Sequence, residues 1–284
     1  MARLATVAAF GFSDFNPSTL LPVYRELGCE SVQYYRNPKN PPKLEDVKRI
    51  IADAGLVIDS IHGVFGPEHD PSSPDEPLRQ FAMRTYREEG EIARKLGGPM
   101  VVVHPAPMAA DPTLVTDIGR QMRIDPMRRS MEQLARAGES LGVIYLIENI
   151  PANYFFGEDA QLIARMVRQF DHPNLKMCFD TGHAHMTTKS LADRDLAACA
   201  DVVAYFHVND NDGTLDAHQI PGLGTCPWEG YAKQFAKMPD AVPAMLELFY
   251  SEEEMKDQVA EGLGERLKKY LALGAGVKDS TGSR

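Results

Sequence analysis

The sequence lacks any uninterrupted apolar run long enough to cross a membrane. A spanning helix needs roughly 18 or more consecutive apolar residues, and no such run occurs. The apolar start at residues 4–10 is too short for a signal peptide and has no convincing cleavage site, so we expect a first strand there. We therefore expect a protein without a membrane partner.

Cysteine is sparse, and positive charge is not in excess. The four cysteines form no CxxC pair, and reduced thiols in a cytoplasmic protein are their simplest interpretation. With 30 Lys and Arg against 40 Asp and Glu, the net charge is −10. Proteins that grip a nucleic acid backbone normally concentrate Lys and Arg. The composition therefore argues against a nucleic acid partner.

The chain also lacks a GxGxxG turn after its first apolar run, which disfavours an open dinucleotide-binding sheet. Short apolar runs alternate instead with longer amphipathic segments. Strands are predicted at 4–10, 31–35, 57–61, 100–103, 143–147, 176–179, 202–206 and 242–246. Helices are predicted at 17–27, 44–54, 76–96, 125–141, 158–170, 191–200, 228–237 and 252–273.

Eight repeats of strand and helix, with strands apolar on both faces, predict an α/β protein that folds as a (β/α)8 TIM barrel. No linker divides the chain. We expect a single domain over residues 1–273 and a loose, Gly- and Ser-rich tail over residues 274–284.

Polar residues follow the apolar core of six predicted strands. These residues are His62, His104, Glu148, Asp180, His207 and Glu247, joined in the adjoining loops by His183, Asp216 and His218. In a barrel, the C-terminal ends of all strands meet at one face. Carboxylates packed so closely repel one another unless a cation joins them. The pattern therefore predicts a metal site.

Glu148, Asp180, His207 and Glu247 would supply three oxygens and one nitrogen. That donor set suits Mn, Co, Mg or Zn without choosing among them. One ion per chain is the simplest expectation, and up to three are compatible with the donors. The other five residues, His62, His104, His183, Asp216 and His218, either orient a substrate or bind further ions.

Several aromatic residues are expected near the mouth of the barrel. They are Phe10, Phe12, Phe65, Tyr154, Phe155, Phe156, Trp228, Phe249 and Tyr250, with Trp228 and Tyr154 predicted as pocket walls. An apolar rim of this kind suggests either a sugar with an attached group or a loop from a neighbouring chain in a homo-oligomer.

The motifs carry a resemblance to a known family. His62-Gly63, Glu148-Asn149, Asp180-Thr181-Gly182-His183, the segment 207–224 and Glu247 resemble the xylose isomerase-like TIM-barrel superfamily. More narrowly, they resemble its sugar phosphate isomerase/epimerase members, over nearly the whole chain.

The resemblance implies a divalent-metal-dependent isomerase or epimerase that acts on a carbohydrate, either a sugar or a sugar phosphate. It implies that Glu148, Asp180, His207 and Glu247 bind the metal. It also implies that Glu148 and Glu247 are the catalytic acid and base on opposite faces of the sugar, acting through a metal-stabilised enediolate.

Two alternative functions stay open, one because the sequence departs from the epimerase pattern and one because the superfamily contains another class of enzyme. Ketose 3-epimerases of the superfamily usually carry an arginine after the histidine of the seventh strand, and none occurs between His207 and Gly224. A dehydratase or lyase acting on a keto-sugar or keto-glycoside therefore stays open.

A second class is the endonuclease IV type of abasic-site nuclease with three zinc ions. The net charge of −10, the weakly basic loops at 13–19 and 37–43, and Gly182 where the nuclease typically has Cys disfavour it.

Overall fold

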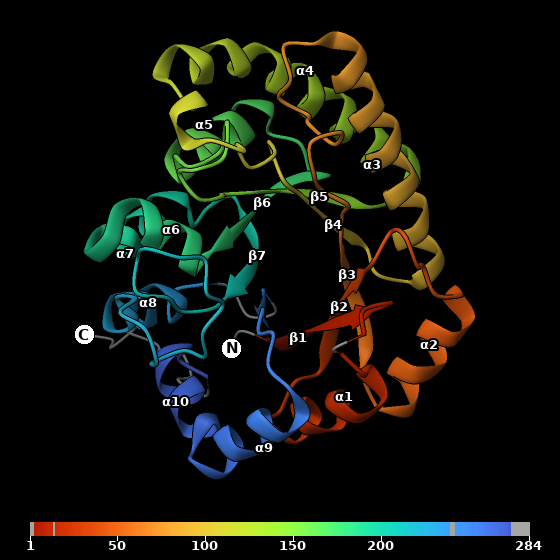
Figure 1. Cartoon of the computed structure of the whole chain (residues 1–284), viewed down its shortest axis with the longest axis vertical. Coiled ribbons are helices and arrows are strands. Elements are labelled where there is room, and N and C mark those ends of the chain that lie inside the picture. The colour runs from red at the N-terminus through yellow and green to blue at the C-terminus, as the bar shows by residue number, and fades with distance from the viewer. Residues whose placement is uncertain (1–2, 14, 239–241, 274–284) are drawn as a thin grey trace, which may run out of the picture.

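The protein is a closed barrel of eight parallel strands, as the sequence predicts. The computed structural model describes residues 3–13, 15–238 and 242–273, so the predicted tail at 274–284 lies outside the described residues. The strands pair in sequence order, and β1 pairs with β8 to close the barrel (Figure 1). They are β1 (Arg3–Phe10), β2 (Ser31–Arg36), β3 (Val57–His62), β4 (Met100–Val103), β5 (Ile144–Glu148), β6 (Leu175–Asp180), β7 (Val203–Val208) and β8 (Pro243–Leu246).

Helices surround the barrel and connect each strand to the next. They are α1 (Pro17–Glu26), α2 (Leu44–Asp53), α3 (Glu76–Leu96), α4 (Asp117–Leu141), α5 (Ala160–Phe170), α6 (Thr181–Thr188), α7 (Ala192–Cys199), α8 (Trp228–Phe235), α9 (Glu252–Ala260) and α10 (Leu263–Tyr270), with 3-10 turns at Pro112–Leu114 and Lys189–Leu191. None of the helices in the described part of the chain is long and apolar enough to cross a membrane.

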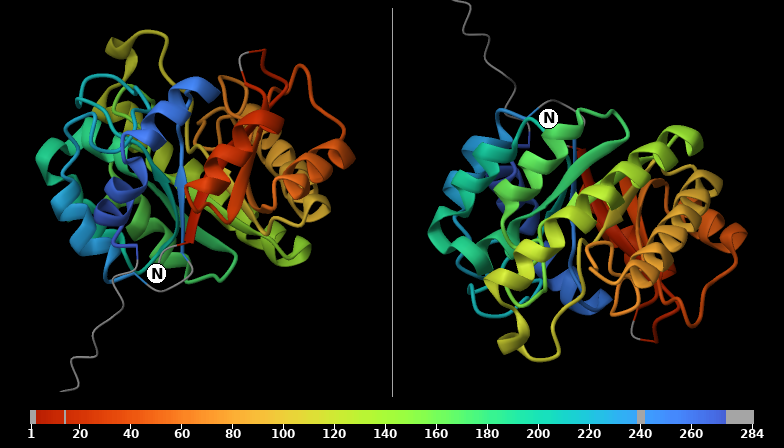
Figure 2. Two further views of the ribbon diagram at one scale, coloured as in Figure 1. Left: turned by 90° about the horizontal axis from the view of Figure 1, so that it is seen from below. Right: turned by 90° about the horizontal axis from the view of Figure 1, so that it is seen from above.

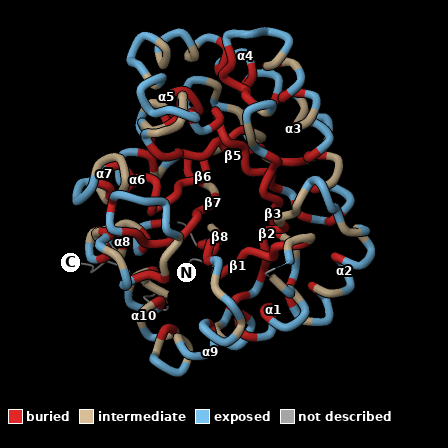
Figure 3. The backbone as a smooth tube through the Cα atoms, in the orientation of Figure 1, coloured by how far each residue is buried: buried red, intermediate tan, exposed pale blue. Residues whose placement is uncertain are grey.

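The strands are buried on both faces, which accounts for their near-continuous apolar sequences. A large core fills the space between strands and helices, and the exposed surface is confined mainly to the outer faces of the helices and the loops (Figure 3). A smaller cluster fills the inside of the barrel, with side chains that include Val7, Met100, Val102, Leu146 and Met245. The barrel interior is therefore packed core, and polar chemistry is left to its rim.

The side views show which end of the barrel is which. The start of β1 lies at one end, and the segment before α4 extends beyond the opposite end (Figure 2). That opposite end holds the C-terminal ends of the parallel strands. The longer strand-to-helix connections lie there, including residues 104–116 and 209–227.

Three helices differ from the prediction. α4 begins at Asp117, where Thr116 caps it by accepting a hydrogen bond from the amide of Gly119, and it continues through Pro126. α6 was not predicted. The predicted helix at 252–273 is two helices, because Gly262 adopts a left-handed conformation with φ of +89°.

Candidate functional site

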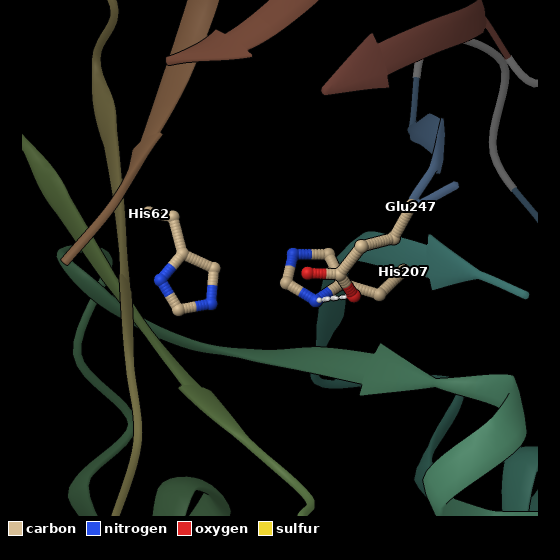
Figure 4. A group of neighbouring side chains, drawn as sticks. All are labelled: His62, His207 and Glu247. Carbon is tan, nitrogen blue, oxygen red and sulfur yellow. Dashed lines mark ion pairs between the residues drawn. The ribbon is translucent and has the colours of Figure 1, made fainter. Parts of the chain in front are cut away.

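The barrel brings the four predicted metal-ligating residues into one buried cluster. Glu148 ends β5, Asp180 ends β6, His207 lies near the end of β7, and Glu247 directly follows β8. One donor atom from each lies within 4.8 Å of the others. Figure 4 shows His207 and Glu247 paired with each other and His62 facing them from β3.

The His207 imidazole sits among three carboxylates. Its Nδ1 lies 2.9 Å from Glu148 Oε1, 3.1 Å from Glu247 Oε2 and 3.9 Å from Asp180 Oδ2. Burial alone would lower the pKa of His207, but the neighbouring negative charges hold it well above its ordinary value. Burial would raise the pKa of Glu247, yet the positive charge of His207 lowers it to about 2. Burial raises the pKa of Asp180 to about 7.

Unpaired polar atoms in this cluster fit a bound cation. Glu148 Oε2 and Glu247 Oε2 are buried. The imidazole nitrogens nearest to them, His104 Nε2 at 3.2 Å and His207 Nδ1 at 3.1 Å, form no hydrogen bond of good geometry with them. A contrast within the same barrel is Asp59, whose buried carboxylate accepts hydrogen bonds from Ser31, Ser60, Tyr205 and Arg3. Buried carboxylate oxygens without donors are costly. The donor set and its geometry therefore suit a divalent metal ion that accepts oxygen and nitrogen ligands.

Two further histidines face the second oxygen of Glu148. His104 Nε2 lies 3.2 Å and His62 Nε2 3.9 Å from Glu148 Oε2. Burial and the neighbouring His104 lower the pKa of His62 to about 4, so its imidazole is neutral at neutral pH. A neutral imidazole can bind a metal ion or hydrogen-bond to a substrate hydroxyl.

A second charged group lies beside the cluster, with His183 from α6 and Asp216 and His218 from the loop after β7. His183 Nε2 lies 3.2 Å and His218 Nε2 3.4 Å from the same oxygen of Asp216. Burial opposes protonation of both rings, but the surrounding carboxylates raise the pKa of His218 to about 9 and that of His183 well above its ordinary value. All nine predicted polar residues thus lie at one end of the barrel.

The residues that hold this loop in place were missed by sequence reasoning. The buried Asp210 carboxylate accepts four hydrogen bonds: from the amides of Asn211 (2.9 Å), Gly222 (2.8 Å) and Cys226 (3.0 Å), and from the indole of Trp228 (2.7 Å). Asp210 therefore ties together both ends of the loop that carries Asp216 and His218. The only sequence signal was a loop rich in Asn, Asp and Gly.

Trp228 therefore has a different role from the pocket wall that the sequence predicts. Its indole is buried, donates to Asp210 and stacks on Tyr270 with ring centroids 5.3 Å apart. It supports the loop from behind and does not lie in the pocket lining described next.

Asn149 and Asn209 fix Asp180. Asn149 accepts a hydrogen bond from the Asp180 amide (2.9 Å), and Asn209 Nδ2 donates to Asp180 Oδ2 (2.8 Å). The other oxygen of Asp180 caps α6 by accepting from the His183 amide at 2.6 Å. Gly182 is required beside them, because a Cβ there would lie 1.9 Å from Asn209 Oδ1.

The cluster opens into a cavity of about 120 Å³. Its lining consists of Tyr35, His62, Phe65, His104, Glu148, Tyr154, His183, Asp216, His218, Glu247 and Phe249. Tyr154 is thus in the lining, as expected from the sequence, whereas Tyr35 was not anticipated. Phe65 and Phe249 are 42% and 38% exposed and form an apolar rim above the polar floor.

Comparison with known proteins places this geometry in context. Two uncharacterised proteins from Methanocaldococcus jannaschii are similar in sequence. One is 25% identical, with 59% of this chain and 62% of the relative covered. The other is 27% identical, with 70% of this chain and 65% of the relative covered. The chain therefore spans less than two thirds of these relatives.

Two relatives have assigned activities. A probable endonuclease 4 from Thermoplasma acidophilum is 24% identical, with 78% of this chain and 74% of the relative covered. D-psicose 3-epimerase from Ruminiclostridium cellulolyticum is 24% identical, with coverage of 66% and 61%.

The crystal structure of 3-keto-D-glucoside 4-epimerase from E. coli shares the fold, with a TM-score of 0.71, 16% identity, and 92% of this chain and 98% of that chain covered. A scan against protein families matches residues 21–270 to the family described as xylose isomerase-like TIM barrel. The chain belongs to the xylose isomerase-like TIM barrel family.

Proposed function

We propose that this protein is a divalent-metal-dependent isomerase or epimerase of a sugar or sugar derivative. The observation that carries the proposal is the pair of buried glutamates, Glu148 and Glu247, whose carboxylates lie 2.9 and 3.1 Å from His207 Nδ1. In each glutamate, one buried oxygen accepts no hydrogen bond of good geometry from the described part of the chain. The family and its sugar epimerase members support the same reading.

Glu148, Asp180, His207 and Glu247 would hold the metal ion. When bound, the ion would supply positive charge that stabilises the enediolate formed when a proton leaves the carbon beside a carbonyl group. The described lining of this cavity contains no lysine or arginine, so the positive charge that the protein itself can place there comes from histidines.

The protein's carboxylates would move the proton. Glu148 and Glu247 both line the cavity. In the metal-free protein, the positive charge of His207 holds the pKa of each below its ordinary value against the effect of burial. One would remove a proton from the substrate carbon and the other would return it from the opposite face. His62 and His104 would orient substrate hydroxyls beside Glu148.

The substrate hydroxyls on the loop side would meet His183, Asp216 and His218. No arginine lies between residues 207 and 224, where ketose 3-epimerases usually carry one. Loss of a β-leaving group in place of reprotonation would make the same site a dehydratase or lyase, and the product analysis below separates these outcomes.

A trinuclear zinc nuclease is the candidate of another class. Its specific support is the endonuclease 4 relative, together with three groups that could each hold an ion: His62, His104 and Glu148; His183, Asp216 and His218; and the four-residue cluster. The net charge of −10 opposes binding to a polyanion.

The test is elemental analysis followed by exchange kinetics. We expect about one divalent ion per chain and deuterium incorporation from D₂O next to the carbonyl of a ketose or keto-glycoside. Glu247→Gln and Glu148→Gln should abolish the incorporation. Loss of a hydroxyl group from the substrate would indicate the lyase. Two or three zinc ions with cleavage of an abasic oligonucleotide would overturn the sugar reading, as would absence of metal after reconstitution.

A further inference from the structure

Aromatic rings extend from the metal-site histidines well beyond the cavity. Phe65 stacks on His104 (centroids 4.6 Å apart, planes at 21°), Tyr35 lies nearly parallel to Phe65 (6.4 Å, 8°), and Phe12 stacks on Tyr35 (5.1 Å, 15°). A row of four near-parallel rings thus leads outward from the site to the loop after β1. Phe15 of the same loop packs edge-on against Phe249 at 5.7 Å.

The outer end of this row borders a second cavity. It has a volume of about 500 Å³ and lies between the loops after β1 and β2, lined by Gly11, Phe12, Ser13, Phe15, Asn37 and Asn40. Ligand pockets usually measure roughly 300 to 1,000 Å³. The metal-site cavity of about 120 Å³ is smaller than that range, and the second cavity falls within it.

The two loops around the second cavity are fixed to each other. Asn37 and Asn40 both donate side-chain hydrogen bonds to the carbonyl of Gly11, at 3.2 and 3.4 Å. Gly11 has φ of +79°, and a Cβ there would lie 2.3 Å from the Asn40 carbonyl oxygen. These contacts hold the start of the loop after β1 against the loop after β2. Each amide carries two N–H groups, so a hydroxyl can be bound beside the Gly11 contact.

The chemistry of this lining is that of a sugar subsite. A pyranose ring has an apolar C–H face, which packs on aromatic rings, and a rim of hydroxyls, which amides hydrogen-bond. The described lining of the second cavity contains no cationic side chain, so it suits a neutral sugar better than a phosphate.

We propose that the substrate spans both cavities, and that it is a keto-sugar carrying a second sugar ring or similar neutral group in glycosidic linkage. The reacting ring lies against the metal-site residues. The attached group crosses the aromatic rim and lies against Phe12 and Phe15, with Asn37 and Asn40 binding its hydroxyls. This inference rests on the proposed function for the reacting ring, but the second cavity can be tested separately.

The kinetic test compares two substrates. One is a disaccharide in which one ring is oxidised to the 3-keto form, and the other is the corresponding free 3-keto-monosaccharide. We expect kcat/KM to be higher for the disaccharide. Phe12→Ala should reduce that preference about five- to tenfold, mainly through KM, because it removes one aromatic stacking partner. Asn40→Ala, a milder change at an exposed position, should reduce it in the same direction.

Phe81→Ala is the matched control. Phe81 is 42% exposed and stacks on His69 on the outside of α3, away from both cavities. It should not alter the preference. Equal kcat/KM for the two substrates, or an equal effect of Phe12→Ala on both, would overturn the proposal.

A binding experiment separates this inference from the proposed reaction. Saturation-transfer NMR with cellobiose, which lacks the keto group, should detect contact with the wild type and the Phe81→Ala variant and a weaker contact with Phe12→Ala. This result would support the sugar subsite even if no sugar were turned over. No contact with cellobiose, or contact unchanged by both Phe12→Ala and Asn40→Ala, would overturn it.

Discussion

Replacement of Asp210 by Asn tests whether one carboxylate holds the loop over the site. Each Asp210 oxygen accepts two hydrogen bonds: Oδ1 from the amides of Asn211 and Cys226, and Oδ2 from the amide of Gly222 and the indole of Trp228. An asparagine keeps one acceptor oxygen and turns a donating NH₂ group towards the other two donors. Two hydrogen bonds to a charged acceptor are lost.

The magnitude follows from these contacts. A hydrogen bond to a charged group contributes about 1.5 to 3 kcal/mol, so the lower end gives a loss of about 3 kcal/mol in the free energy of unfolding. For a chain of 284 residues, with an unfolding entropy of about 2.1 cal/mol/K per residue, that corresponds to a fall of about 5 °C in the melting temperature. Because the loop carries Asp216 and His218, kcat/KM should fall as well.

Asp212→Asn provides a control in the same loop. Asp212 is exposed, and one oxygen accepts both of its hydrogen bonds from Thr214. An asparagine can keep both, so the change should stay within about 0.5 kcal/mol. Urea unfolding of both variants measures the difference. If Asp210→Asn loses no more stability than Asp212→Asn, Asp210 does not hold the loop as we infer.

Three further predictions concern the metal cluster and its charges. Glu247→Gln should lower turnover at least about 100-fold, since it removes a proton-transferring group, and should weaken metal binding. Steady-state kinetics measure the turnover, and elemental analysis measures the bound metal. Near-normal turnover would exclude Glu247 from the proton transfer. Removal of the metal by a chelator should lower the free energy of unfolding by about 3 kcal/mol, compared with protein in a free metal concentration of 100 times Kd. An unchanged melting temperature in calorimetry would contradict a native metal site. In the metal-free protein, the pKa of His218 is raised from 6.5 to about 9, so its charged form contributes stability that is fully present below pH 6.5 and is lost as the pH rises through about 9. Unfolding experiments between these pH values should show that decline in the wild type and a smaller one in His218→Asn, and identical slopes would refute the assignment.

Much of the fold was predictable because apolar strands and glycine-terminated helices mark their own ends. α3 occurs at residues 76–96, as expected, with Gly97 in the left-handed conformation that ends it. α6 was not predictable from periodicity, because it is short and its first residues, Thr181, Gly182 and His183, are all buried. Its start depends on a cap from Asp180, a residue that the sequence pattern assigns to a metal site.

The prediction for α4 failed for another reason. Asp125 precedes Pro126, and a proline is typical of the first turn of a helix, so the pattern placed the helix start there. In the structure, the helix continues through Pro126 from a cap at Thr116. Sequence alone could not decide between these readings, because a buried proline within a helix is tolerated when tertiary packing supports it.

The polar cluster was predictable to the extent that barrel topology determines it. Eight parallel strands must place Glu148, Asp180, His207 and Glu247 at one end of the barrel, whatever the details of the loops. The contacts of Asp210 and the position of Trp228 depend on how residues 209–227 fold in three dimensions, and no local pattern encodes them. Whether the four clustered residues bind a metal stays a prediction.

The double role of Asp180 gives the barrel rim a built-in reporter. One oxygen of this carboxylate caps α6 through the amide of His183, and the other is held by Asn209. Any ion that draws on the Asp180 charge also changes how firmly that amide proton is held. Hydrogen–deuterium exchange at the first turn of α6 should therefore register occupancy of the cluster without a substrate, a product or a chromophore, and ligand screening can begin before the reaction is known.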